Sequence, residues 1–160
     1  MSRAFIKEDN AAVLTEAVLP NHTISSHPNL VTQTGLKALE CQLQLARDAL
    51  AEAKKAEGAN QRKQRTSLSL RDIKYYSERL LTAKLVTPEA NPRKIGFGHL
   101  VSLRYDDGRS LTYRLVGEDE SDPSEGRISF VSPVAQNLMG KSVGDYVTVG
   151  EHEIEILDIF

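Results

Sequence analysis

Hydrophobic residues between Leu36 and Ala53 recur at alternating intervals of three and four, with polar residues between them. This spacing places one narrow apolar seam along a helix and is typical of coiled-coil pairing. The seam consists of Leu36, Leu39, Leu43, Ala46, Leu50 and Ala53. We expect Thr32 or Thr34 to cap the start of this helix and Gly58 to end it.

A second run with helical spacing follows a short polar interval, residues 57–65. Its apolar positions are Leu70, Ile73, Tyr76, Leu80 and Ala83. Two such seams in succession fold most simply into an antiparallel helical hairpin. We therefore predict a coiled-coil hairpin over residues 32–86 with its tip near residues 57–66, followed by a linker over residues 87–93.

From Gly98 onward the hydrophobic period changes to two, which is typical of half-buried strands. Asp106-Asp107-Gly108 suits a hairpin turn between the first two strands, because glycine adopts the positive φ that such turns need. Ser132-Pro133 predicts the start of one short helix that ends at Gly140. The remaining strands are expected around Ile128 and over residues 143–149 and 153–159. The predicted class is α+β, with an antiparallel sheet and one short helix over residues 94–160.

Residues 1–31 are expected to form a partly mobile N-terminal extension, with a short helix over residues 9–19. His22 and His27 lie in a loop rich in serine and proline, and no other ligand type is nearby. A zinc site normally needs three or four convergent ligands, so no metal site is predicted there.

Composition indicates a soluble cytoplasmic protein, with 40% hydrophobic residues, 26% charged residues and a single cysteine. No apolar run approaches the roughly 20 residues that a membrane helix needs. The net charge of -2 is unevenly distributed: residues 32–86 hold 11 Lys/Arg and 6 Asp/Glu, whereas residues 94–160 hold 6 and 12. A partner carrying both signs would therefore meet the protein in a preferred orientation.

No set of side chains typical of nucleophilic catalysis stands out, and we predict no catalytic residue, metal or cofactor. Gly140-Lys141-Ser142 lacks the earlier glycine of a phosphate-binding loop, since position 135 is alanine. The tip is the remaining candidate. Its cations are Lys54, Lys55, Arg62, Lys63 and Arg65, opposed by Glu52 and Glu57. It is either a solvated loop or a basic probe for an acidic pocket or a phosphate backbone.

Several motifs in the second half of the chain occur together in a fixed order. They are Phe97-Gly98, the run from Tyr113 to Glu120, Ile128-Ser129, the run from Ser132 to Ala135, and Leu138, Gly140 and Lys141. With residues 32–39 and 84–86, they make residues 31–160 resemble the bacterial GreA/GreB transcript-cleavage factors. The resemblance implies a C-terminal domain like that of FK506-binding proteins and a hairpin that enters the secondary channel of RNA polymerase.

Two departures from the family concern the hairpin. The family's tip carries paired acidic residues that hold a catalytic magnesium ion, whereas this tip reads Glu57-Gly58-Ala59-Asn60-Gln61-Arg62-Lys63-Gln64-Arg65. The hairpin is also about two heptads shorter, which removes about 10 Å of reach. We therefore expect regulation by occupancy without transcript cleavage. The alternatives are a cleavage-stimulating factor that uses a non-standard tip, for example Glu57, and, more weakly, a prolyl isomerase.

The resemblance also implies which residues meet the polymerase. The channel contacts would come from Glu57, Asn60, Gln61, Arg62, Lys63 and Arg65, and the docking contacts from Asp119, Glu120, Ser132, Pro133 and Lys141. The expected partner is bacterial RNA polymerase, with indirect contact to the nucleic acid of the elongation complex, including its DNA. We expect a monomer that does not bind membranes.

Overall fold

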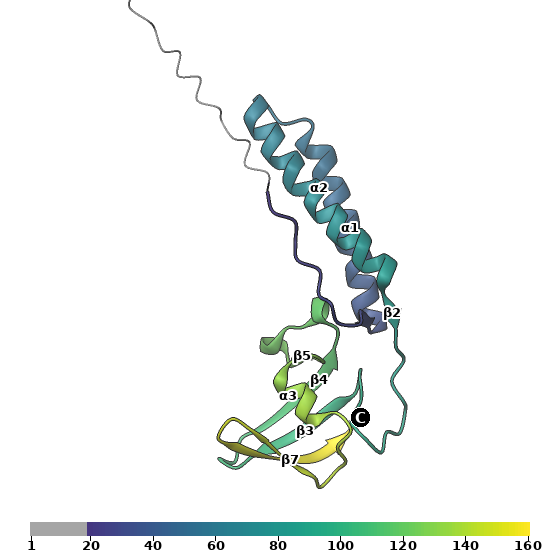
Figure 1. Cartoon of the computed structure of the whole chain (residues 1–160), viewed down its shortest axis with the longest axis vertical. Helices are drawn as coiled ribbons and strands as arrows, with labels where there is room; N and C mark the ends of the chain where they lie inside the picture. The colour runs from purple at the N-terminus through teal and green to yellow at the C-terminus, as the bar shows by residue number, and fades with distance from the viewer. Residues whose placement is uncertain (1–18) are drawn as a thin grey trace, which may run out of the picture.

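A helical hairpin stands on a small curled sheet in the computed structural model, which describes residues 19–160 (Figure 1). Helix α1 (Gln33–Ala53) and helix α2 (Ala59–Thr82) run antiparallel and are joined by residues 54–58. At 1.5 Å per residue, α1 alone is about 32 Å long. The predicted α+β class, with a hairpin ahead of a sheet and one short helix, is confirmed.

The seam of α1 follows the predicted pattern. Leu39, Leu43, Ala46 and Ala53 are buried along one side of the helix. Their side chains shrink from leucine to alanine toward the interhelical loop, which lets the two backbones approach each other there.

The seam of α2 differs from the prediction. Leu70 is 51% exposed, while Ser69 is buried beside it. Ile73, Tyr76 and Leu80 are half-buried, so the seam passes through position 69. Successive helical residues point about 100° apart, so a shift of one position takes Leu70 out of the contact. Ser69 fits at this position because its hydroxyl donates to the Arg65 carbonyl at 3.0 Å.

One helix end lies where the sequence predicts it, and two do not. Thr32 caps α1, as one of the two expected candidates, and its hydroxyl accepts from the Gly35 amide at 2.9 Å. Gly58 does not end α1; it precedes α2 with a φ of 89°, a conformation that favours glycine. Residues 59–65, predicted as part of the tip, are helical. At the other end, α2 stops at Thr82, and residues 84–85 form a strand.

The C-terminal sheet contains five strands in the order β5-β4-β3-β7-β6. They are β3 (Leu100–Tyr105), β4 (Ser110–Val116), β5 (Arg127–Ser129), β6 (Tyr146–Val149) and β7 (His152–Ile159). The expectation of a wholly antiparallel sheet is wrong, because β5 pairs parallel with β4. Two 3₁₀ turns, η1 (Glu118–Glu120) and η2 (Pro123–Glu125), carry the chain back so that β5 runs in the direction of β4.

The core lies between one face of this sheet and helix α3 (Pro133–Leu138). As predicted, the Ser132 hydroxyl caps α3 and proline occupies its first turn. The largest side chains that are completely buried come from four elements: Val101 and Leu103, Leu115 and Val116, Leu138, and Ile154 and Ile156. Buried and less buried positions alternate over residues 100–104 of β3 and 153–157 of β7, whereas β4 ends in two consecutive buried residues, Leu115 and Val116.

Residues 19–31 run along α2 to the base of the hairpin (Figure 1). There β1 (Leu30–Val31) pairs parallel with β2 (Lys84–Leu85). The buried Asn29 donates to the Arg79 carbonyl at 2.7 Å and to the Thr82 hydroxyl at 3.0 Å. Most of the helix predicted over residues 9–19 lies outside the described residues. Within residues 19–160, no helix has both the length and the hydropathy to cross a membrane.

Candidate functional site

Five cations gather at the far end of the hairpin. We call Lys54, Lys55, Arg62, Lys63 and Arg65 the basic tip, and all five are exposed. Lys54 and Lys55 come from the interhelical loop, and the others come from the first two turns of α2. Lys55 pairs with Glu52 at 2.7 Å, but both side chains are 71% exposed, so solvent screens this pair strongly.

The start of α2 adds to the positive character of this end. Gly58 offers no side chain to cap the helix, and its first turn contains no acidic residue. The positive end of the helix dipole is therefore left to solvent or to a partner. Arg62 closes the loop, because its Nε donates to the Ala56 carbonyl at 3.2 Å. The remaining residues predicted to contact the channel, Glu57, Asn60 and Gln61, are also exposed here.

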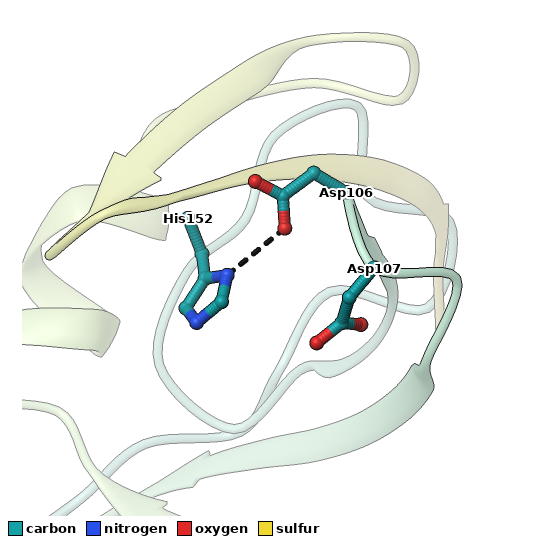
Figure 2. A group of neighbouring side chains, drawn as sticks. All are labelled: Asp106, Asp107 and His152. Atoms are coloured by element: carbon teal, nitrogen blue, oxygen red, sulfur yellow. Dashed lines mark hydrogen bonds and ion pairs between the residues drawn. The ribbon is translucent and has the colours of Figure 1, made fainter.

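The described residues contain one group of three side chains placed closely enough to share a metal, and it lies on the sheet, away from the basic tip. Figure 2 shows Asp106, Asp107 and His152 at the β3–β4 turn. His152 Nδ1 lies 2.9 Å from Asp106 Oδ1, and Asp107 accepts from Arg109 Nε at 2.6 Å. The hydrogen bond from His152 is the main reason that the pKa of Asp106 is lowered. Because both carboxylates already bind partners within the protein, we interpret the group as one that stabilises the β3–β4 turn.

A second polar cluster, which we call the junction, joins the hairpin to the C-terminal domain. Asp119, on η1, accepts from Arg79 Nε and from the Tyr75 hydroxyl, each at 2.5 Å. The Arg79 side chain is 3% exposed and that of Asp119 is 17% exposed, so the ion pair is largely removed from water. Burial, followed by the hydrogen bond to Asp119, raises the pKa of Tyr75.

Glu120 forms the other half of the junction. It accepts from the Thr32 hydroxyl at 2.5 Å, the same hydroxyl that caps α1. Two glycines allow this approach: a Cβ on Gly35 would lie 2.5 Å from Glu120 Oε2, and a Cβ on Gly117 would lie 2.3 Å from the Leu30 carbonyl oxygen. The start of α1 and the C-terminal domain are therefore in direct contact.

The double role of Thr32 leads to a testable prediction. Thr32→Ala removes both the helix cap and the hydrogen bond to Glu120, so the free energy of unfolding should fall by about 1 kcal/mol. Thr34→Ala is the matched control, because Thr34 is exposed in the first turn and caps nothing. Urea denaturation of the unmodified protein and of the two variants measures the change in the free energy of unfolding. Equal losses in both variants would contradict the capping role.

The structure places the predicted docking residues in different settings. Asp119 and Glu120 are engaged by the hairpin of the same molecule. Ser132 caps α3, next to the exposed Pro133. Lys141 is exposed, and its carbonyl accepts from the Ile95 amide at 2.8 Å. Sequence reasoning missed the partners of the two acids. The available signal was Arg79, a charged residue directly before the seam position Leu80.

Comparisons with known proteins agree on one family. The family model described as "Transcription elongation factor, GreA/GreB, C-term" matches residues 89–160. Transcription elongation factor GreA of Helicobacter pylori strain 26695 is 42% identical over 90 residues, which cover 52% of this chain and 55% of that protein. GreA of Helicobacter hepaticus is 45% identical over 87 residues, covering 51% and 53%. The chain thus spans about half the length of the curated relatives it matches.

Two solved structures are also similar in part. The GreA factor homolog 1 (Gfh1) protein of Thermus thermophilus is 23% identical with a TM-score of 0.40, and the match covers 82% of this chain and 97% of that one. The elongation factor GreA/GreB of Nitrosomonas europaea is 20% identical with a TM-score of 0.39, covering 81% and 97%.

Proposed function

Because the GreA/GreB C-terminal family model matches residues 89–160, we propose that this chain is a transcription elongation factor of that family and regulates elongation by binding bacterial RNA polymerase at the secondary channel. The hairpin would occupy the channel and the C-terminal domain would hold it there. Regulation would follow from occupancy, since a filled channel excludes other factors that use it.

The chemistry of the basic tip is the observation that carries this proposal. In two-metal catalysis, carboxylates bind the metal ions, and the ions stabilise the attacking and leaving oxygens. Here Glu57 is flanked in the sequence by five exposed cations, and the uncapped start of α2 adds positive potential. Such a surface attracts carboxylates and phosphates and repels divalent cations.

Binding to purified core polymerase tests the proposal directly. We expect the labelled full-length chain to form a complex at micromolar concentration or below, and the affinity to fall as salt rises because the tip is cationic. A native-gel or fluorescence-anisotropy titration measures this. Absence of a complex at 10-fold higher concentration would rule out the proposed function.

A second candidate function is stimulation of transcript cleavage, which the exposed Glu57 at the tip favours. It predicts that a backtracked elongation complex with magnesium yields shortened RNA when the protein is added, and that Glu57→Ala lowers this yield. We expect instead no shortening above the polymerase's own background with either protein. Gel analysis of end-labelled RNA separates the two outcomes, with Glu89→Ala in the exposed linker as the control substitution.

A further inference from the structure

The segment that leads into α1 lies against the second half of α2, and we call residues 21–31 the strap (Figure 1). Its contacts advance along α2 in the same order as its own residues. His22 contacts Asp72 at the end farther from the base of the hairpin. Asn29 contacts Arg79 near that base, where β1 pairs parallel with β2. The strap therefore runs parallel to α2 as a third segment packed on the hairpin.

The inner half of the strap, residues 29–31, belongs to the hydrogen-bonded fold. Asn29 is 5% exposed and Val31 is 3% exposed. The Lys84 amide donates to the Asn29 carbonyl at 2.8 Å, and the Val86 amide donates to the Val31 carbonyl at 3.0 Å. Buried backbone groups that lose such partners destabilise the protein, so this half separates from α2 only when the base of the hairpin unfolds.

The outer half of the strap, residues 21–25, is held by side chains at the surface. His22 Nε2 lies 2.8 Å from Asp72 Oδ1, and the two side chains are 41% and 38% exposed. The imidazole also meets the Tyr75 ring edge-on, with the ring centroids 5.2 Å apart. Solvent screens an ion pair of this exposure, so the outer half separates from α2 far more readily than the inner half.

Ile24 gives the outer half a defined seat on α2. This half-buried residue lines a small hollow together with four residues of the helix, Arg71, Lys74, Tyr75 and Glu78. Their spacing of three, one and three positions is that of the hole which receives a knob when helices pack. The outer half is thus placed specifically on α2, although long polar side chains form most of its seat.

Tyr75 connects the outer half of the strap to the junction. Its ring meets His22, and its hydroxyl donates to Asp119, the acid that also pairs with Arg79. A cavity of about 440 Å³ lies here, lined by His22 from the strap, Tyr75 and Tyr76 from α2, and Asp119 from η1, with α1 as the remaining wall. The outer half therefore closes one side of a cavity between the hairpin and the C-terminal domain.

We propose that the outer half of the strap is a latch on the junction. While it is seated on α2, His22 holds the Tyr75 ring in the position from which its hydroxyl binds Asp119. When it lifts away, the cavity opens on that side and the hydrogen bond to Asp119 weakens, so the hairpin is held less firmly to the C-terminal domain. The inner half stays in place, because the chain bends at residues 26–27 between the two halves.

Asp72→Ala in the full-length protein tests the latch, because it removes the partner of His22 and leaves the strap itself unchanged. Hydroxyl-radical footprinting with mass spectrometry measures the exposure of each tyrosine. Loss of an exposed ion pair shifts an opening equilibrium a few-fold, so we expect oxidation of Tyr75 to rise about twofold and that of Tyr113 on β4 to stay constant. Asp48→Ala is the matched control, because Asp48 is an exposed acid of α1 with a side-chain partner of its own.

Hydrogen exchange followed by NMR on the same variants reports the state of the junction. The Glu120 amide, which donates to the Gly117 carbonyl in η1, should exchange faster in Asp72→Ala, while the Lys84 amide keeps its rate. Unchanged oxidation of Tyr75 would overturn the latch. Greater oxidation with unchanged exchange at Glu120 would show that the strap opens without affecting the junction, and faster exchange at Lys84 would show that its two halves open together; either result contradicts the proposal.

Discussion

Replacing Arg79 with alanine should lower the free energy of unfolding by about 3 kcal/mol and loosen the hairpin from the C-terminal domain. The Arg79 side chain is 3% exposed and pairs with Asp119, whose other oxygen accepts from Tyr75. Removal of the guanidinium leaves the carboxylate with one hydrogen-bond donor in a site shielded from water. Asp119→Asn should also destabilise the junction, because it leaves the buried cation without a counter-charge.

Urea denaturation and hydrogen exchange report the two consequences of Arg79→Ala separately. The denaturation midpoint should fall, and the amides of η1 should exchange faster while those of β3 and β7 stay protected. Arg47→Ala provides the control, because Arg47 is an exposed arginine on the facing helix. A loss below about 1 kcal/mol, with unchanged exchange in η1, would mean that the junction does not hold the two parts together.

Reversing three charges of the basic tip should strongly weaken binding to the polymerase. The triple substitution Lys54→Glu, Lys55→Glu and Arg62→Glu changes the local charge by six units at exposed positions. Attraction to an acidic or phosphate-lined surface then becomes repulsion, so we expect at least a tenfold loss of affinity for polymerase. The loss should be largest at low salt, where screening is weakest.

A second triple variant controls for net charge. Lys37, Lys84 and Arg93 are exposed cations outside the tip, and their replacement by glutamate changes the total charge equally. Anisotropy titrations at two salt concentrations compare the variants. If both triple variants lose affinity to the same extent, long-range attraction explains the binding and the basic tip has no special role.

Sequence patterns predict a feature correctly where that feature depends on neighbouring residues. The seam of α1 follows its heptad spacing, Thr32 caps the helix it precedes, and Gly108 takes a φ of 86° in the predicted turn. Each of these features is set by neighbours within about four positions, which is the range that hydrophobic periodicity and turn chemistry report.

Features that depend on distant contacts could not be read from the pattern. Arg79 is buried because Asp119, 40 residues further along, meets it, and a search for apolar seams passes over a charged residue. Leu70 is the opposite case. Its apolar side chain lies one position from the seam, so hydrophobic spacing assigns it to the seam although it is exposed. The parallel pairing of β5 depends likewise on how residues 117–126 turn back.

The same distinction between local and long-range features applies to the candidate sites. The basic tip could be predicted from charge clustering alone, because its members lie close together in the sequence. The row of side chains on the sheet could not, because Arg104, Tyr146 and Glu155 become neighbours only through the register of three strands. Family motifs indicated Asp119 and Glu120, and the structure gives these two residues partners in the hairpin.

A competition assay tests the central claim, that the protein acts by occupying the secondary channel. A backtracked elongation complex is incubated with magnesium and a fixed amount of a cleavage-active GreA, and this protein is added in increasing amounts. The account predicts that RNA shortening by GreA declines as the protein is added, and that the protein alone produces none. Undiminished GreA cleavage at saturating protein, or shortened RNA with this protein alone, would contradict it.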